Sequence, residues 1–206
     1  MSKRGSSRRW LREHHADGFV ADAREAGYRA RSVYKLAEVD RRDRVLHAGM
    51  TVVDLGASPG GWSQYARERV GADGRVVALD RLPMKPLAGV DFIQGDFRED
   101  AVLDWVLAVL QGCDVRLVLS DMSPNIVGIK AVDQPRMMHL AELAAELAER
   151  VLVPGGTMLV KVFQGEGFPA FLQDLRGRFA RVDSRKPEAS RARSRELYLL
   201  AKGYGV

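Results

Sequence analysis

Hydrophobic and polar positions follow two patterns that alternate along the chain. Short apolar runs typical of buried strands occur five times, and two weaker runs follow them, at residues 51–54, 75–80, 90–94, 115–120, 157–163, 179–182 and 196–201. Apolar residues spaced three or four positions apart, typical of helices, occupy residues 28–44, 62–70, 101–110, 134–151 and 169–179. The pattern therefore predicts helices between most successive strands.

Strands that alternate with helices predict an α/β fold. Parallel neighbours need a long crossover connection, which a helix supplies, so we expect a Rossmann-like, mostly parallel seven-stranded sheet with helices on both faces. We expect one domain over residues 1–206, with a basic helical segment at 1–45 and a Rossmann-like core at 46–206. Ligands of such sheets bind at the carboxyl ends of the strands, so the residues there are the candidates for chemistry.

Composition excludes several classes of protein. The 206 residues are 46% hydrophobic and 29% charged, which is typical of a soluble globular protein. Cys113 is the only cysteine, so neither an intramolecular disulfide nor a cysteine-cluster metal site can form. The apolar runs are far shorter than the roughly 18 residues that span a bilayer. We expect a cytoplasmic protein without a membrane segment, with an organellar origin as the minor alternative because the basic residues 1–12 superficially resemble a transit peptide.

Charge is distributed unevenly around a net value of +5. Residues 1–35 and 176–195 carry net charges of +5 and +6, whereas the long stretch between them carries −6. If the fold brings the two basic segments together, they form one face that binds a polyanion by neutralising its phosphates. Either segment alone fits a solvated surface equally well. Together, with Trp10, Tyr28 and Tyr34 interleaved, they favour binding of RNA or DNA.

A glycine-rich turn follows the first predicted strand in the sequence Asp54-Leu-Gly-Ala-Ser-Pro-Gly-Gly-Trp62. Such a turn lets a ligand approach the backbone closely. Its spacing is not that of a dinucleotide site, and Pro59 lacks an amide donor that a pyrophosphate would use. The second and third strands lead to Asp80 and Asp96. Carboxylates around the turn suit a ligand that is uncharged or positive there, which favours S-adenosylmethionine over NAD.

Two lysines and two acids form a candidate catalytic group. Asp121 follows the fourth predicted strand, and Lys161 lies inside the apolar fifth strand, where a lysine is costly unless it is paired. These two side chains could meet at the carboxyl edge of the sheet. Glu196 follows the second basic segment, and Lys35 lies in the first predicted helix. Each of these residues alone is more often structural, but together in one cleft they would form a proton-transfer group.

The motifs together resemble those of the FtsJ/RrmJ family of ribose 2′-O-methyltransferases, nearly from end to end, and the bacterial members that act on 23S rRNA in particular. The resemblance is carried by residues 32–36, 53–57, 59–64, 94–97, 120–122, 160–167 and 190–196. Ser58 and Ser123 stand where alanine is expected in those bacterial members. Both are small, and neither departure affects the assignment.

The resemblance implies the fold of the S-adenosylmethionine-dependent methyltransferases, with S-adenosylmethionine as the methyl donor. It implies methylation of the ribose 2′-hydroxyl of a uridine in 23S rRNA, on the 50S subunit. It also implies a catalytic tetrad of Lys35, Asp121, Lys161 and Glu196. The contacts to the donor are expected at Gly56, Gly60, Trp62, Asp80, Asp96 and Asp121. We expect a monomer and no metal, since the four histidines show no ligand spacing.

The roles within the tetrad are hypotheses. A ribose hydroxyl is a poor nucleophile until its proton is leaving, so Lys161 is the candidate base; a charged group that steers the oxygen is the alternative role. Lys35 would orient the hydroxyl, Asp121 would hold Lys161 and approach the donor, and Glu196 would fix the cluster. The candidates for phosphate contacts on the two sides of the cleft are Arg29, Arg31, Arg191 and Arg193.

Three other functions compete with this interpretation. A tRNA 2′-O-methyltransferase of the same family would use the same tetrad, although the compact size and the extent of the match favour rRNA. A non-catalytic RNA-binding ribosome-assembly factor would have no need for Lys35 together with Lys161. An NAD-linked oxidoreductase is disfavoured by Pro59 and by the missing phosphate-binding fingerprint.

Overall fold

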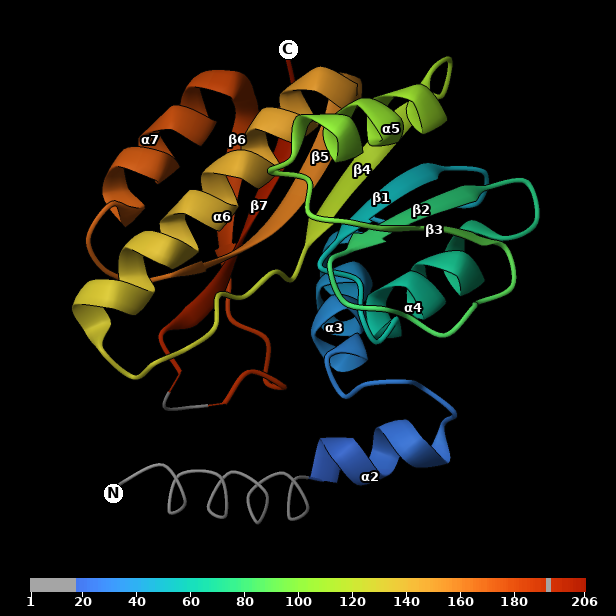
Figure 1. Cartoon of the computed structure of the whole chain (residues 1–206), viewed down its shortest axis with the longest axis horizontal. Helices are drawn as coiled ribbons and strands as arrows, with labels where there is room; N and C mark the ends of the chain where they lie inside the picture. The colour runs from blue at the N-terminus through green and yellow to red at the C-terminus, as the bar shows by residue number, and fades with distance from the viewer. Residues whose placement is uncertain (1–17, 192–193) are drawn as a thin grey trace.

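A seven-stranded sheet forms the centre of the computed structural model, which describes residues 18–191 and 194–206 (Figure 1). The strand order is β3-β2-β1-β4-β5-β7-β6. The first five strands pair in parallel, and β7 runs antiparallel between β5 and β6. The bounds are β1 Thr51–Leu55, β2 Arg75–Asp80, β3 Val90–Gln94, β4 Val115–Ser120, β5 Leu152–Phe163, β6 Phe179–Arg185 and β7 Glu196–Tyr204.

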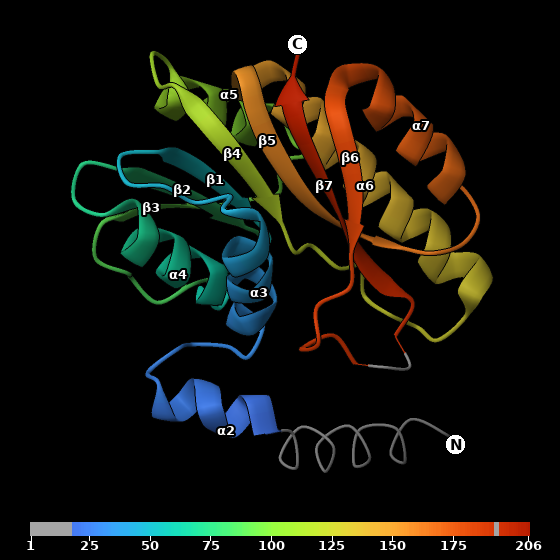
Figure 2. The ribbon, with the colours of Figure 1, turned by 180° about the vertical axis from the view of Figure 1, so that it is seen from behind.

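Helices cover both faces of this sheet. One face carries α5, α6 and α7, seen in front in Figure 1, and the other carries α3 and α4, seen from behind in Figure 2. A further helix, α2, lies outside these layers next to α3. The bounds are α2 Gly18–Glu25, α3 Val33–Asp43, α4 Gly61–Val70, α5 Asp100–Leu110, α6 Lys130–Val151 and α7 Phe168–Arg178. The predicted mostly parallel sheet with helices on both faces is confirmed.

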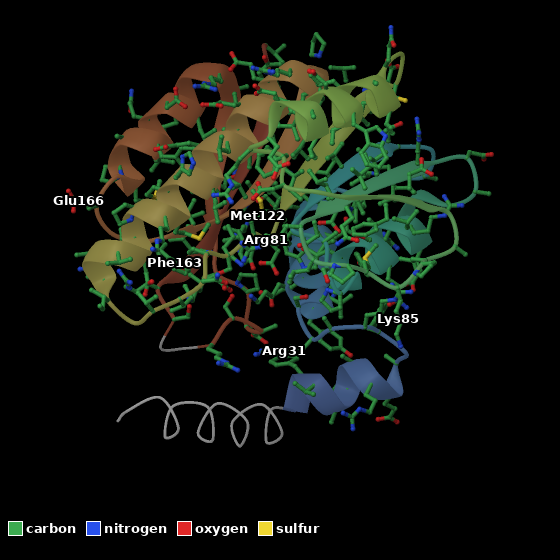
Figure 3. The ribbon with its side chains drawn as sticks, viewed as in Figure 1. Arg31, Arg81, Lys85, Met122, Phe163 and Glu166 are labelled. Carbon is green, nitrogen blue, oxygen red and sulfur yellow. The ribbon has the colours of Figure 1, made fainter. Side chains whose placement is uncertain are left out.

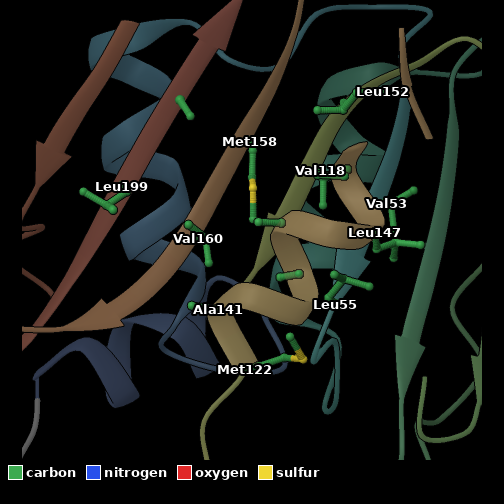
Figure 4. Packing of buried hydrophobic residues seen from close by; sticks show 14 of the residues in the cluster. Val53, Leu55, Val118, Met122, Ala141, Leu147, Leu152, Met158, Val160 and Leu199 are labelled. Carbon is green, nitrogen blue, oxygen red and sulfur yellow. The ribbon is translucent and has the colours of Figure 1, made fainter. Parts of the chain in front are cut away.

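The core lies on both sides of the central strands, because neighbouring residues of a strand point to opposite faces. Val53 and Leu55 of β1 pack with Ala141 of α6 on one side (Figure 4). Val52, the residue before Val53, packs with Trp62 of α4 on the other. Burial on both faces explains why the central strands are near-continuous apolar runs rather than alternating ones.

Element ends differ from the predicted ones at the junction of α6 and β5. The helix begins at Lys130, four residues before the predicted start, and β5 begins directly after it at Leu152 rather than at Thr157. The register explains this difference. Val115 of β4 pairs with Leu152 and Leu117 pairs with Thr157, so the intervening proline and glycines are absorbed as an irregularity within the strand. The sequence suggests a turn there because proline and glycine usually end elements.

The topology brings residues from distant parts of the chain to one edge of the sheet. The strands β1 to β5 end there, as expected. Because β7 is antiparallel to β5, its first residue is also at that edge: Glu196 pairs with Phe163, and Tyr198 pairs with Lys161. The helix α3 packs against α4 on the same side. Within the described ranges 18–191 and 194–206, no helix has the length and apolar character needed to cross a bilayer.

Candidate active site

Four predicted residues and one tyrosine form a continuous polar network at this edge. Lys161 Nζ donates to Oδ1 of Asp121 at 3.0 Å and to its backbone oxygen at 2.6 Å. Lys35 Nζ donates to Oε1 of Glu196 at 2.7 Å. The hydroxyl of Tyr198 joins the two ion pairs, since it donates to Asp121 Oδ1 at 2.6 Å and accepts from Lys35 Nζ at 3.2 Å. The structure thus brings the predicted tetrad together.

Local structure explains how these side chains converge. Residues two apart in a strand point to the same face, so Glu196 and Tyr198 of β7 both face the helix α3. Lys161 lies directly opposite Tyr198 in the pairing of β5 with β7. Asp121 follows β4, and its backbone N–H donates to the oxygen of Leu55 in β1. This main-chain contact fixes the acid at the end of the sheet.

Burial makes this network electrostatically strong. The side chain of Lys161 is only 5% exposed, and two of its three N–H donors are directed to Asp121. Burial would raise the pKa of Asp121, but the positive charges of Lys161 and Lys35 and the hydrogen bond from Tyr198 outweigh it and lower that pKa. Burial and the neighbouring carboxylates raise the pKa of Tyr198 well above its ordinary value. The aspartate is therefore held ionised and the tyrosine neutral, as a donor.

The connection between β6 and β7 holds the side chain and the backbone of Glu196 in place. Ser190 Oγ donates to Glu196 Oε1 at 2.8 Å, and Lys186 Nζ donates to the backbone oxygens of Ser194 and Glu196. Burial and the nearby charge of Lys35 lower the pKa of Lys186, although Glu196 opposes this effect.

Sequence reasoning missed Tyr198, Ser190 and Lys186. The signal that could have found Tyr198 is its two-residue spacing from Glu196 in a predicted strand, which places both side chains on one face.

A cavity of about 580 Å³ adjoins the network, at the ends of β1, β2, β3 and β4. Four of the predicted donor contacts line it: Gly56, Asp80, Asp96 and Asp121. Gly56 has a φ of +77°, and a Cβ there would lie 2.7 Å from Cγ of Met122, so glycine permits the close approach of the loops after β1 and β4. Figure 3 shows Met122 and Arg81, both lining residues, at this edge of the sheet.

The two carboxylates at the far end of the cavity differ in their partners. Asp80 accepts backbone N–H groups from Ser58 at 2.9 Å and Leu82 at 2.8 Å, so it organises the loops after β1 and β2. Asp96 is paired with Arg98, whose Nε lies 2.9 and 3.0 Å from its two oxygens. This pairing lowers the pKa of Asp96. Before any ligand binds, Asp96 is therefore held ionised by Arg98, and Asp80 is held by two backbone hydrogen bonds.

Two predicted donor contacts lie outside the lining of this cavity. Trp62 is 3% exposed; its Nε1 donates to the oxygen of Ser32 at 2.7 Å, and its ring packs against Tyr198 with centroids 5.6 Å apart. Gly60, with a φ of +110°, is the N-cap of α4 and lies against Met84 and Arg29. In this structure Trp62 joins α4 to the start of α3 and supports the tetrad from behind.

The arginines predicted to bind phosphate are placed differently. Arg29 donates to the backbone oxygens of Lys85 at 2.5 Å and Pro86 at 2.7 Å, and Arg31 donates to that of Ala189. Both therefore have partners within the chain. Arg191 is half-buried near this contact, and Arg193 lies outside the described residues. The contact of Arg31 with Ala189 shows that the two basic segments meet.

In the part of the chain that the structure describes, no three His, Cys, Asp or Glu side chains lie close enough to hold an ion.

Comparisons with known proteins identify relatives of this chain by sequence and by fold. A family model described as FtsJ-like methyltransferase matches residues 28–204. The chain is 57% identical to the Ribosomal RNA large subunit methyltransferase E of Alkalilimnicola ehrlichii, over 99% of this chain and 98% of that protein. It is 56% identical to the enzyme of the same name from Hahella chejuensis, over 99% of both. A solved ribosomal RNA methyltransferase structure from Plasmodium falciparum superposes with a TM-score of 0.77 at 30% identity, over 86% of this chain and 98% of that one.

Proposed function

Because the chain belongs to the FtsJ-like methyltransferase family, we propose that it transfers a methyl group from S-adenosylmethionine to the 2′-hydroxyl of a uridine ribose in 23S rRNA, on the 50S subunit. The observation that carries the proposal is the buried network of Lys161, Asp121, Tyr198, Lys35 and Glu196 at the mouth of an acid-lined cavity. The protein acts as a monomer in the cytoplasm, and the segment with α2 and α3 contributes to RNA binding.

The cavity fits the proposed donor. Its volume of about 580 Å³ is in the range of small-molecule sites. Asp80 and Asp96 would accept hydrogen bonds from hydroxyl and amino groups, while Leu82, Phe97 and Met122 offer apolar contact to a purine. Arg81, Arg98 and Arg136 also line the cavity, and Arg98 is paired with Asp96. When bound, S-adenosylmethionine supplies a methyl group that its sulfonium makes electrophilic.

The residues of the network would activate and orient the attacking oxygen. Lys161 Nζ, as the neutral amine, would take the proton of the 2′-hydroxyl as that oxygen attacks the methyl carbon and the bond between this carbon and sulfur breaks. Asp121 would hold the amine through its side-chain and backbone oxygens. Lys35, held by Glu196 and Tyr198, orients the oxygen. The proton then leaves Lys161 for solvent. Every cation in this cluster is paired with an acid, so little reorganisation is needed when substrate binds.

The proposal is tested by methyl transfer to purified RNA substrates. The protein is incubated with S-adenosylmethionine labelled in its methyl group and with 50S subunits from a strain that lacks this activity, with tRNA as the parallel substrate. We expect label on one rRNA ribose, lost in Lys161→Ala. Label on tRNA instead would move the substrate to the tRNA class. No label on either RNA, with the donor still bound, would favour the assembly factor.

The role of Lys161 is tested by Lys161→Arg. Arginine keeps the positive charge but cannot accept a proton near neutral pH, so a steering role would survive and a base role would not. We expect kcat to fall by about 10²- to 10⁴-fold, the usual contribution of general base catalysis. Substantial activity in this variant would overturn the base role.

A further inference from the structure

Exposed aliphatic side chains occur in the two loops that follow β2 and β4, both of which contribute residues to the cavity lining. Among the described residues, six large apolar side chains are more than half exposed, and four of them follow β2 or β4: Leu82 (55%), Ile126 (56%), Val127 (54%) and Ile129 (58%). Leu82 lines the cavity, and so does Asn125, the residue before Ile126. We call Ile126, Val127 and Ile129 the apolar tip. Apolar groups clustered beside a reaction site mark an interaction surface.

The apolar tip is held in one shape by a buried carboxylate. Asp133, in the first turn of α6, accepts the backbone N–H groups of Val127 and Gly128, both at 2.9 Å. Its own N–H donates to the oxygen of Ile129 at 2.9 Å, and Gly128 takes a φ of +85°. Because this loop is already ordered, it loses little conformational entropy when it binds a partner.

A second contact joins the apolar tip to the cavity. Arg81 Nη2, after β2, donates to Oδ1 of Asn125 at 3.2 Å, so the loops after β2 and β4 meet at the rim. Figure 3 shows Arg81 next to Met122 at this edge. The apolar tip is therefore continuous with the site where the reaction is proposed.

The charges around the apolar tip indicate its partner. Arg81, Lys130 and Arg136 are exposed cations on the same two loops and the first turns of α6. Aliphatic side chains framed by cations match the apolar faces of nucleobases between phosphates. Proteins that reach atoms inside RNA recognise splayed, unstacked bases, and apolar side chains inserted between bases unstack them.

We propose that the apolar tip packs against the nucleobases that flank the target nucleotide and holds them unstacked, so that its ribose reaches Lys161. This inference rests on the proposed function and adds the residues that select an unpaired target. RNA whose flanking bases stay stacked in a duplex would offer the apolar tip no base faces to pack against.

The test uses the double variant Ile126→Ser/Ile129→Ser, whose side chains lie on the surface. Trp105→Ser is the matched control, because Trp105 is 51% exposed on α5, away from the cavity lining. Methylation is measured on 50S subunits and on a protein-free rRNA fragment. We expect kcat/KM for both RNAs to fall at least about tenfold in the double variant, consistent with loss of base contacts. The Kd for S-adenosylmethionine and the Tm should stay unchanged, and the control should match the wild type.

A binding readout makes the test independent of turnover. A fluorescent base analogue placed beside the target ribose reports unstacking when the protein binds the fragment. We expect the signal to rise with the wild type and with Trp105→Ser and not with the double variant. An equal rise with the double variant would overturn the inference, as would wild-type kcat/KM on both RNAs. A loss confined to 50S subunits would assign the apolar tip to a ribosomal protein instead. If the wild type unstacks the base but methylates neither RNA, the proposed function fails and the inference stands.

Discussion

Tyr198 contributes one hydroxyl to both ion pairs of the tetrad. Tyr198→Phe removes the hydrogen bond to the charged Asp121, and such bonds contribute about 1.5–3 kcal/mol. We expect kcat to fall roughly 10- to 100-fold by this reckoning, while the Kd for S-adenosylmethionine changes little. A purely structural role would instead lower the Tm with the activity per folded molecule retained. Tyr204→Phe is the control, because its hydroxyl donates to the oxygen of Glu149 at 3.1 Å, outside the network.

Asp54 is a fully buried acid in β1, with Oδ2 accepting from Ser63 Oγ at 2.6 Å and Oδ1 without a hydrogen-bond partner among the described residues. Burial, opposed by the Ser63 bond and assisted by Asp121 and Asp80, raises its pKa to about 7. The folded state then binds more protons than the unfolded chain between about pH 4 and 7. This contribution to the free energy of unfolding is therefore lost as the pH rises through that range.

The variant Asp54→Asn removes this titration. Between pH 4 and pH 8 we expect its stability to rise relative to the wild type by up to about 4 kcal/mol, measured by urea denaturation. Asp73→Asn, at an exposed position, should follow the wild type. Stability curves of Asp54→Asn and the wild type that stay parallel across this range would contradict the raised pKa.

Single residues show which parts of the site could be predicted from the sequence and which could not. The residues at strand ends pointed to Asp121 and Lys161, because alternation and topology place strand ends together. Arg29 and Arg31 were expected to bind phosphate because they lie in a basic segment. Their backbone-oxygen partners lie 30 to 158 positions away in the chain, and a residue's charge gives no sign of such contacts.

At the scale of elements, one ion pair holds the end of α3 against β6. Arg185 Nε and Nη2 each lie 2.7 Å from an oxygen of Asp43, in a two-pronged contact with both side chains nearly buried. The hydrogen bond from Arg185, more than its charge, lowers the pKa of Asp43 against the effect of burial. Because α3 carries Lys35, this contact positions part of the tetrad.

Arg185→Met should therefore lower the free energy of unfolding at pH 7 by about 3 kcal/mol, since the largely buried Asp43 then keeps only a longer ion pair, 3.9 Å, with Lys202 Nζ. The lowered pKa means that the pair stabilises the fold above the ordinary pKa of aspartate and loses this effect as the pH falls. The deficit should accordingly shrink below about pH 4. Arg181→Met, which removes an exposed arginine, should cost little. A deficit that is constant down to pH 3 would argue for lost packing rather than lost charge.

The elements themselves were largely predictable, since the apolar periods of the strands and of α4 to α7 match the structure. The first and last residues of the elements were less predictable. Where α6 passes directly into β5, residues 154–156 suggest a turn, but they lie inside the strand as an irregularity between Leu152 and Thr157, which both pair with β4. Pairing partners decide such ends, and they are not local in sequence.

At the scale of the whole molecule, the two basic segments converge beside the tetrad, through Arg31 and Ala189. We expect Arg191→Ala/Arg193→Ala to weaken RNA binding and to reduce the slope of log Kd against log salt by about 1.4 to 1.8, because each lost phosphate contact removes roughly 0.7 to 0.9. Arg181→Ala, on β6, is the control. An unchanged slope in the double variant would remove these arginines from the RNA surface.

The position of β7 in the strand order could not be predicted from the hydrophobic periodicity. Alternating elements predicted a mostly parallel sheet, which the structure confirms, but periodicity does not say that the last strand enters between two earlier ones. Because β7 pairs with β5 there, Glu196 and Tyr198 lie at the same edge of the sheet as Lys161.

The late arrival of β7 has a consequence for how the protein comes into being. Lys35 and Glu196 are 161 positions apart, so the network at the sheet edge closes only after the chain has been synthesised through β7 and this strand has paired with β5. A nascent or truncated chain could form the Asp121–Lys161 half and still lack the rest. On the proposed mechanism, a partly synthesised chain that lacks β7 therefore cannot modify its target.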